Sequence, residues 1–161
     1  RANKCHYTDK KIDCYTTFEG IKGRTLDMTV ELSGEEYNNF TVEMACDDEY
    51  GTVFTYNRVA GVLEIDRTCC GVTKDVVCVR KIKIADTDRK LKLRFIMDRQ
   101  SIELFINDGQ QVATTAICTP LQADGISFNC DGSAVVDIEK YDIQDILTGK
   151  KEVQYGCSCI R

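Results

Sequence analysis

Short runs of alternating apolar and polar residues, separated by turns, constrain the fold of this chain most. Between Leu91 and Met97 every second side chain is apolar, and Ile102, Leu104 and Ile106 continue the alternation. A period of two places successive side chains on opposite faces of a β-strand. No stretch sustains the 3.6-residue period of an amphipathic helix, although the segment after Asp142 could add a helical turn or two. The pattern therefore predicts an all-β protein.

Ten strands are predicted, each rich in Val, Ile, Thr, Phe or Tyr and bounded by turn residues. They are Thr25–Leu32, Phe40–Cys46, Thr52–Asn57, Gly61–Asp66, Val76–Ile84, Lys90–Asp98, Ser101–Asn107, Gln110–Ile117, Gly125–Cys130 and Ser133–Tyr141. The strongest hairpin signal is Asp108-Gly109, because both residues tolerate positive φ. With 161 residues the chain has the size of one domain. We therefore expect a two-sheet antiparallel β-sandwich of the concanavalin or lectin type.

Charge and hydropathy exclude two classes of partner. The chain carries 21 Lys and Arg against 26 Asp and Glu, a net charge of −5. Nucleic-acid binders present a basic face to the phosphates, whereas the basic residues here are interspersed with acids. No apolar run approaches the roughly 20 residues of a membrane-spanning helix. We expect neither a nucleic-acid partner nor a membrane.

Ten cysteines are the unusual part of the composition. No pair of Cys-x-x-Cys motifs is present, and the single His6 has no second histidine to complete a zinc site. We expect no metal and no cofactor. Most of the cysteines are interpreted as small reduced side chains, which favours the bacterial cytoplasm, with a secreted, disulfide-bonded protein as the alternative.

Two stretches of the chain resemble a known family. The run Leu91-Lys-Leu-Arg-Phe-Ile-Met-Asp-Arg-Gln-Ser-Ile-Glu-Leu-Phe-Ile-Asn-Asp-Gly109 resembles the signature LR-x-x-x-D-x-S-x-E-x-F-x-N-D-G of the C-terminal β-sandwich module of glycoside hydrolase family 32. The upstream run Gly61–Gly71 is similar to a second signature that ends in Asp-Arg-Ser-x-Ser-Gly. Here Thr68 and Cys70 replace the two serines, and the cysteine is a further reason to expect reduced thiols.

The resemblance covers residues 25 to 145 and implies a division of the chain. Residues 1–24 are expected to form a leader or linker with room for one added strand. Residues 25–146 would form the sandwich module, and residues 147–161 a tail that bears Cys157 and Cys159. Because the sequence begins with Arg1 rather than Met, we expect it to be part of a longer protein. A free-standing protein with unrelated duties is the alternative.

The same resemblance implies a non-catalytic role. In family 32 the catalytic carboxylates lie on an N-terminal propeller, in Asn-Asp-Pro-Asn-Gly, Arg-Asp-Pro and Glu-Cys motifs, and no such motif occurs here. The module is expected to support the propeller of a fructan- or sucrose-hydrolysing enzyme and to help a homodimer assemble. The second hypothesis is a carbohydrate-binding module for the terminal fructosides of levan or related fructans.

The carbohydrate-binding hypothesis rests on four charged residues in the signature stretches, Asp66, Arg67, Asp98 and Glu103. Carboxylates and a guanidinium make strong hydrogen bonds to sugar hydroxyls. The structural alternative is an ion pair between Arg67 and Asp98, with Glu103 bound to backbone or to Arg94. A catalytic carboxyl pair among these acids is not expected, because acids at strand ends usually cap turns.

Overall fold

The computed structural model describes residues 1–71, 77–85 and 90–144. Within these residues eleven strands and no helix are formed. They are β1 (Ala2–Ile12), β2 (Leu26–Glu36), β3 (Asn39–Cys46), β4 (Thr52–Asn57), β5 (Val62–Asp66), β6 (Val79–Lys83), β7 (Leu91–Met97), β8 (Ser101–Ile106), β9 (Gln111–Ala116), β10 (Gly125–Cys130) and β11 (Ser133–Asp142). All ten predicted strands are found within a few residues of their expected bounds.

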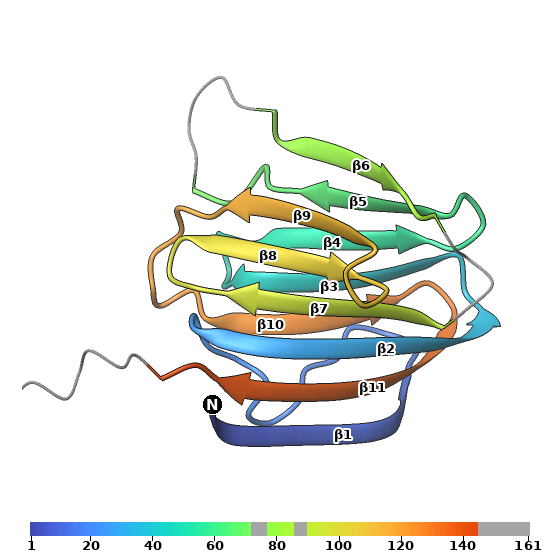
Figure 1. Ribbon diagram of the computed structural model, residues 1–161, viewed down its shortest axis with the longest axis horizontal. Coiled ribbons are helices and arrows are strands. Elements are labelled where there is room, and N and C mark those ends of the chain that lie inside the picture. Colours follow the sequence, from blue (N-terminus) through green and yellow to red (C-terminus); the bar gives the residue numbers. More distant parts are fainter. Residues whose placement is uncertain (72–76, 86–89, 145–161) are drawn as a thin grey trace, which may run out of the picture.

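The strands form two antiparallel sheets packed face to face (Figure 1). The six-stranded sheet has the order β1-β11-β2-β7-β8-β9, and the five-stranded sheet the order β10-β3-β4-β5-β6. The predicted β-sandwich is therefore confirmed. The turn after β8 also has the expected backbone, since Asp108 and Gly109 have φ values of +59° and +87°.

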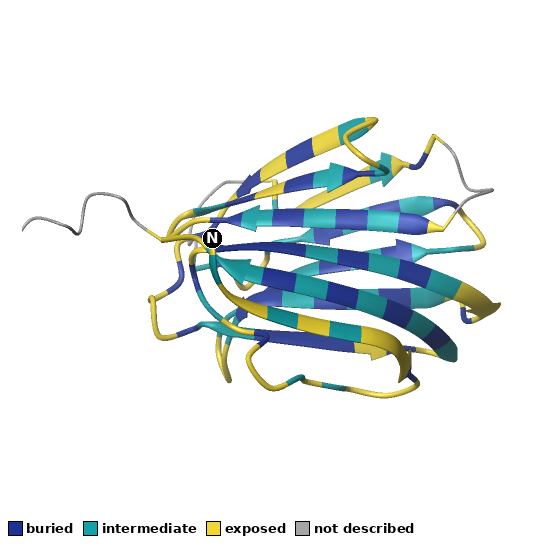
Figure 2. Ribbon diagram, turned by 60° about the horizontal axis from the view of Figure 1, so that its bottom comes forward, coloured by how far each residue is buried: buried dark blue, intermediate teal, exposed yellow. Residues whose placement is uncertain are grey.

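The core lies between the sheets, and its pattern follows the alternation of the sequence. Figure 2 shows buried and partly exposed residues alternating along the strands. On β7, Leu93, Phe95 and Met97 are at most 1% exposed, whereas the residues between them are half-buried. Phe95 meets Phe54 of the opposite sheet edge-to-face, with ring centroids 5.1 Å apart. This contact joins the middles of the two sheets.

The first 24 residues contribute a strand and a connecting segment. β1 pairs with β11 and so forms an edge of the six-stranded sheet. The following segment crosses to the other sheet, where the backbones of Thr16 and Phe128 pair. The rings of Tyr7, Phe18 and Phe128 form a continuous contact, with centroid distances of 4.8 and 5.6 Å. This segment therefore covers the side of the sandwich between β1 and β10.

Two expectations concern residues outside the described part of the chain. The helical turns expected after Asp142 would fall mostly beyond residue 144, and the Cys-bearing tail, residues 147–161, lies wholly beyond it. Among the described residues there is also no helix of the length and apolar character that a membrane crossing needs.

Candidate functional site

Asp66 and Arg67 lie where β5 ends, and both stabilise the turn that follows. The Oδ1 atom of Asp66 accepts hydrogen bonds from the backbone N–H of Thr68 at 2.8 Å and from its hydroxyl at 2.6 Å. The Nε–H of Arg67 donates to the Sγ atom of Cys70 at 3.5 Å. The backbone N–H of Arg67 donates to the carbonyl of Cys78 at 2.8 Å. These contacts are those of a structured turn.

Asp98 stabilises the β7–β8 hairpin in a similar way. Its Oδ1 atom accepts hydrogen bonds from the backbone N–H groups of Gln100 and Ser101, each at 2.9 Å, and from the Ser101 hydroxyl at 3.1 Å. The hydrogen bond from the Gln100 N–H is the largest cause that lowers the pKa of the Asp98 carboxyl. Asp98 is therefore ionised at neutral pH.

The four predicted site residues do not converge. Asp66 and Arg67 lie at the end of β5 in the five-stranded sheet, whereas Asp98 lies in the β7–β8 turn and Glu103 on β8, both in the six-stranded sheet. The expected ion pair between Arg67 and Asp98 is not formed. Glu103 is exposed on β8, and Arg94 binds Asp27 instead of Glu103. The pairing of Arg67 with Asp98 was therefore wrong, whereas Asp66 and Asp98 cap turns, as acids at strand ends usually do.

Asp98 lines a hollow of about 900 Å³ at one end of the sandwich, here called the end pocket. Its lining also includes Arg24, Asp124, Leu121 and Ile143; Asp66, Arg67 and Glu103 are not part of this lining. The carboxylates of Asp98 and Asp124, the guanidinium of Arg24 and two apolar side chains therefore surround one space.

Arg24 lines the end pocket and is held there by hydrogen bonds to the surrounding loops. It is 8% exposed, and its Nη1 atom donates to the Thr119 hydroxyl at 2.8 Å and to the Pro120 carbonyl at 2.7 Å. Its Nη2 atom donates to the carbonyl of Arg99 at 2.7 Å. Burial of the guanidinium lowers its pKa. Arg24 thus fixes the loop before β10 against the β7–β8 turn.

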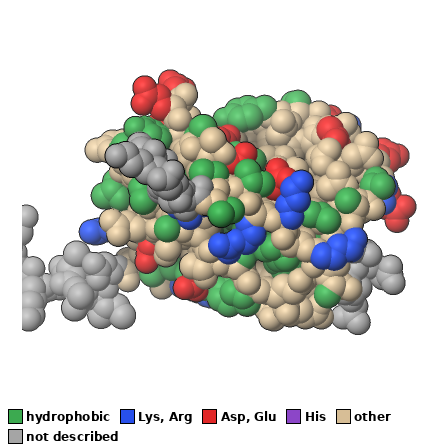
Figure 3. Space-filling model, turned by 90° about the horizontal axis from the view of Figure 1, so that it is seen from above, with side chains coloured by type: hydrophobic (Ala, Val, Ile, Leu, Met, Phe, Trp, Pro, Cys, Tyr) green, Lys and Arg blue, Asp and Glu red, His purple; other side chains and the backbone are tan. Residues whose placement is uncertain are grey.

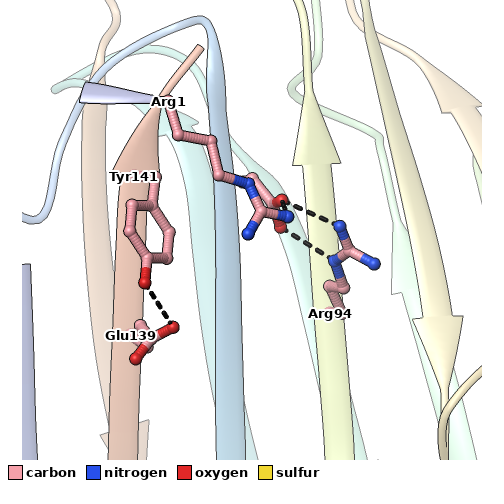
Figure 4. Close-up of polar contacts among 5 residues, drawn as sticks. Arg1, Arg94, Glu139 and Tyr141 are labelled. Atoms are coloured by element: carbon pink, nitrogen blue, oxygen red, sulfur yellow. Dashed lines mark hydrogen bonds and ion pairs between the residues drawn. The ribbon is translucent and has the colours of Figure 1, made fainter. Parts of the chain in front are cut away.

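A second charged cluster, which was not predicted from the sequence, lies on the outer face of the six-stranded sheet. Arg94 donates from Nε and Nη2 to the two oxygens of Asp27, at 2.9 and 2.8 Å. Arg1 also donates to Asp27. Figure 4 shows Arg1 and Arg94 pointing toward one another, with Tyr141 and Glu139 beside them on β11. We call Arg1, Asp27, Arg94, Glu139 and Tyr141 the outer-face cluster.

Electrostatics favour the charged state of this cluster. Asp27 is 5% exposed although it faces outward, because the guanidinium groups cover it. The hydrogen bonds from Arg94 lower the pKa of the Asp27 carboxyl and outweigh the opposing effect of burial. The same contact raises the pKa of Arg94. Tyr141 donates its hydroxyl to Glu139 at 2.8 Å, and Lys4 approaches the other oxygen of Glu139 at 2.9 Å.

The outer-face cluster borders a hollow of about 330 Å³, here called the outer-face pocket. Its remaining lining is Thr29 on β2, Lys92 on β7, Phe105 on β8, and Asp108 and Gly109 in the turn after β8. Lys92 contacts Asp108 at 2.9 Å. Three cations and three carboxylates thus surround one space, and Phe105 adds an apolar wall.

The outer-face pocket could not be located from local sequence patterns. Asp27 and Arg94 are 67 residues apart, and they meet because β2 pairs with β7 rather than with β3. Alternation correctly places Lys92 and Arg94 on the polar face of β7. It does not say which strand lies beside β7, since that depends on the topology of the whole sheet.

The described residues contain no group of three His, Cys, Asp or Glu side chains that could hold a metal ion. What they offer chemically is hydrogen bonding by charged groups around two hollows. Such groups suit a ligand rich in hydroxyls or a polar protein surface.

Comparisons with known proteins agree with this fold. The family model described as "Glycosyl hydrolases family 32 C terminal" matches residues 1–145, and so includes the first 24 residues. A sucrose-6-phosphate hydrolase of Staphylococcus xylosus is 27% identical over 76% of this chain and 25% of its own length. A probable sucrose-6-phosphate hydrolase of Vibrio cholerae serotype O1 is 34% identical over 78% of this chain and 21% of its own.

Solved structures give the same fold. The exo-inulinase of Aspergillus awamori superposes with a TM-score of 0.77 at 21% identity, over 87% of this chain and 29% of the other. The chain thus spans about a quarter of the length of the curated relatives that it matches.

Proposed function

The chain belongs to the C-terminal domain family of the family 32 glycosyl hydrolases, and we propose that it is a non-catalytic support for the catalytic domain of its parent enzyme. That catalytic domain would be an N-terminal propeller. Its substrate would be sucrose, a phosphorylated sucrose or a fructan, the substrates named for the relatives. The sandwich would pack against the propeller and stabilise it.

This proposal rests on the hydrogen bonds that the carboxylates of the signature stretches accept. A glycosidase needs two carboxyls on either side of one bond, and its general acid needs a raised pKa. Asp66 and Asp98 instead accept hydrogen bonds within their own turns, and the pKa of Asp98 is lowered. Glu103 stands exposed on a strand of the other sheet from Asp66. Asp66 and Asp98 thus stabilise turns of the fold, and the separation of Asp66 and Glu103 onto different sheets supports a non-catalytic role.

The test uses the full-length parent enzyme. Phe54 is 1% exposed and joins the two sheets through Phe95, so Phe54→Ala should cost the sandwich about 3–5 kcal/mol. We expect normal hydrolysis at 25 °C but thermal inactivation several degrees below that of the wild type. Val59→Ala is the matched control, because Val59 is 75% exposed. Inactivation at the wild-type temperature, with the sandwich measurably destabilised, would contradict the supporting role.

Activity of the isolated chain is the second arm of the test. We expect no hydrolysis of sucrose, inulin or levan by the pure chain. Turnover that copurifies with the folded chain through successive columns would overturn the non-catalytic interpretation. Sedimentation of the full-length enzyme would show whether the sandwich also contributes to a homodimer, as we propose.

Carbohydrate binding is the second candidate function. It is favoured by the two hollows, each lined by an arginine and carboxylates. Of the residues predicted from the sequence, Asp98 is the one placed at such a hollow. Calorimetric titration of the isolated chain with levan, inulin and sucrose tests this function. Saturable heat would support it. A flat trace from a folded sample would contradict it, and the supporting role would then be the one remaining candidate function.

The proposed location of the enzyme is the bacterial cytoplasm. The structure describes seven cysteines without a disulfide, Cys5, Cys14, Cys46, Cys69, Cys70, Cys118 and Cys130, and a reducing compartment keeps thiols in this state. The count of free thiols proposed in the Discussion tests this location.

A further inference from the structure

We propose that the outer-face pocket is a binding site for one neutral sugar residue, such as the terminal residue of a saccharide chain. The proposal deepens the carbohydrate-binding function and rests on it, but it places the site at Arg94, Asp27 and Phe105 rather than at the four residues predicted from the sequence. It is independent of the supporting role.

The register of the sheet brings the key residues side by side. Thr29 on β2 lies opposite Arg94 on β7, and Arg94 lies opposite Phe105 on β8. Directly opposite residues in antiparallel strands have their side chains about 5 Å apart on one face. An aromatic ring and a guanidinium therefore stand next to each other, on rigid strands rather than on loops. Such placement preorganises a binding site.

Arg94 is held in one orientation and still has donors to offer. The two hydrogen bonds to Asp27 use its Nε and Nη2 atoms, so the guanidinium plane is fixed. Its Nη1 atom makes no hydrogen bond to another described residue. The side chain is 41% exposed, so these N–H groups are accessible at the pocket. A fixed fork donor loses little entropy when a ligand hydroxyl binds.

The charge of the lining selects a neutral ligand. The cations are Arg1, Lys92 and Arg94, and the carboxylates are Asp27, Asp108 and Glu139, so the lining has no net charge. Each cation already contacts one of these carboxylates. A phosphate or carboxylate ligand would meet three negative groups with no unpaired cation to offset them. Sugar hydroxyls both donate and accept, so they can use both kinds of group.

Phe105 supplies the apolar contact that sugars also need. It is half-buried and lines the pocket beside Arg94. The ring of Tyr141 is already covered, because the guanidinium of Arg1 lies 5.0 Å from its centroid. The C–H face of a sugar therefore has the ring of Phe105 as its apolar partner. Contacts of this kind give an aromatic residue a large share of the binding energy.

The volume of the pocket limits the ligand to about one sugar unit. At about 330 Å³ the hollow lies at the lower end of the ~300–1,000 Å³ typical of small-molecule sites. A long chain would have to extend beyond it. The pocket therefore fits a single residue, which a free sugar or the end of a saccharide chain can present.

The experiment measures binding of fructose, sucrose and levan to the chain by calorimetry, with folding of each variant checked by thermal melting. Phe105→Ala removes the apolar wall, and Arg94→Lys keeps the charge beside Asp27 but loses the fork. We expect each to weaken binding about tenfold or more, as the loss of one good contact does. Val112→Ala is the matched control. Val112 lies opposite Phe105 and is 55% exposed but does not line the pocket, so binding should not change.

The remaining outcomes distinguish a wrong location of the sugar site from the absence of carbohydrate binding. Binding that Asp98→Asn abolishes while Phe105→Ala leaves it intact would place the sugar in the end pocket and overturn this inference alone. A folded wild-type chain that binds none of the three probes would overturn the inference together with carbohydrate binding. Tighter binding of sucrose 6-phosphate than of sucrose would overturn the requirement for a neutral ligand.

Discussion

Arg94 and Arg67 differ in how much their side-chain contacts stabilise the fold. Arg94 holds the buried carboxylate of Asp27 with two hydrogen bonds. The side chain of Arg67 contacts the sulfur of Cys70, whereas the structural alternative predicted from the sequence was an ion pair with Asp98. A turn residue such as Asp98 finds its partners two or three positions away, so its location at a turn was predictable. The Asp27–Arg94 pair depends on which strands are neighbours, and local sequence does not determine that.

We expect Arg94→Ala to lower the free energy of unfolding by about 1–3 kcal/mol. The value is below the ~3–5 kcal/mol for a fully buried pair, because Arg94 is 41% exposed and Arg1 still contacts Asp27. Arg67→Ala, which breaks a weak hydrogen bond to sulfur, should cost less than about 1 kcal/mol. Urea denaturation at pH 7 measures both. A larger loss from Arg67→Ala than from Arg94→Ala would contradict the pairing.

Strands were predictable mainly where one face is buried, with the exposed strand β6 as the exception. The ten predicted strands each alternate or form a short apolar run, whereas β1 buries little besides Ile12. Its pairing with β11 is interrupted by two bulges, near Asn3 and Asp9, where φ is positive. Bulges shift which face a side chain points to, so the two-residue period is lost. This is why the sequence predicted residues 1–24 only as a leader or linker with room for one added strand.

The opposite end of the molecule also has a free edge, formed by β6. Its residues are exposed except for half-buried Ile82, and Arg80, Lys81 and Lys83 give it positive charge. Figure 3, seen from the β6 side, shows Lys and Arg side chains among apolar ones on this face. Charged edge strands discourage pairing with a second chain, because like charges would be brought together.

Replacing both lysines of β6 should make the chain aggregate. We expect the double variant Lys81→Thr, Lys83→Thr to form soluble oligomers or precipitate on heating well below the aggregation temperature of the wild type, since Thr favours extended pairing. Light scattering during a thermal ramp measures this. Lys90→Thr changes an exposed lysine outside the strands and serves as the control. Equal aggregation of all three proteins would show that the β6 charges do not protect the edge.

Across the whole molecule, the described cysteines differ in how far they are exposed to solvent. Cys14, Cys69 and Cys118 are exposed, whereas Cys70 and Cys130 are buried. Burial raises the pKa of the half-buried Cys46 thiol to about 11, so this thiol is protonated at neutral pH. Because the thiolate is the reactive form, Cys46 should react slowly.

We expect the native chain to react with a thiol reagent at Cys14, Cys69 and Cys118 first, and the denatured, non-reduced chain to reveal the remaining described thiols. Mass spectrometry of peptides after timed alkylation measures the order. Labelling of Cys46 or Cys70 as fast as Cys14 would contradict the packing. A total of two or fewer free thiols after denaturation would reverse the proposed cytoplasmic location in favour of secretion.

Because β1 pairs with β11, β1 cannot join its sheet until β11 has been translated. β11 separates β1 from β2 in the six-stranded sheet, and Ala2 pairs with Asp142. Of the strands that the structure describes, β1 is therefore translated first and its pairing partner β11 last. At synthesis rates of about 5–20 residues per second, the delay between the two strands is on the order of ten seconds. β1 carries Lys4, Lys10 and Lys11 and is mostly exposed, so we expect it to stay soluble until β11 has been made.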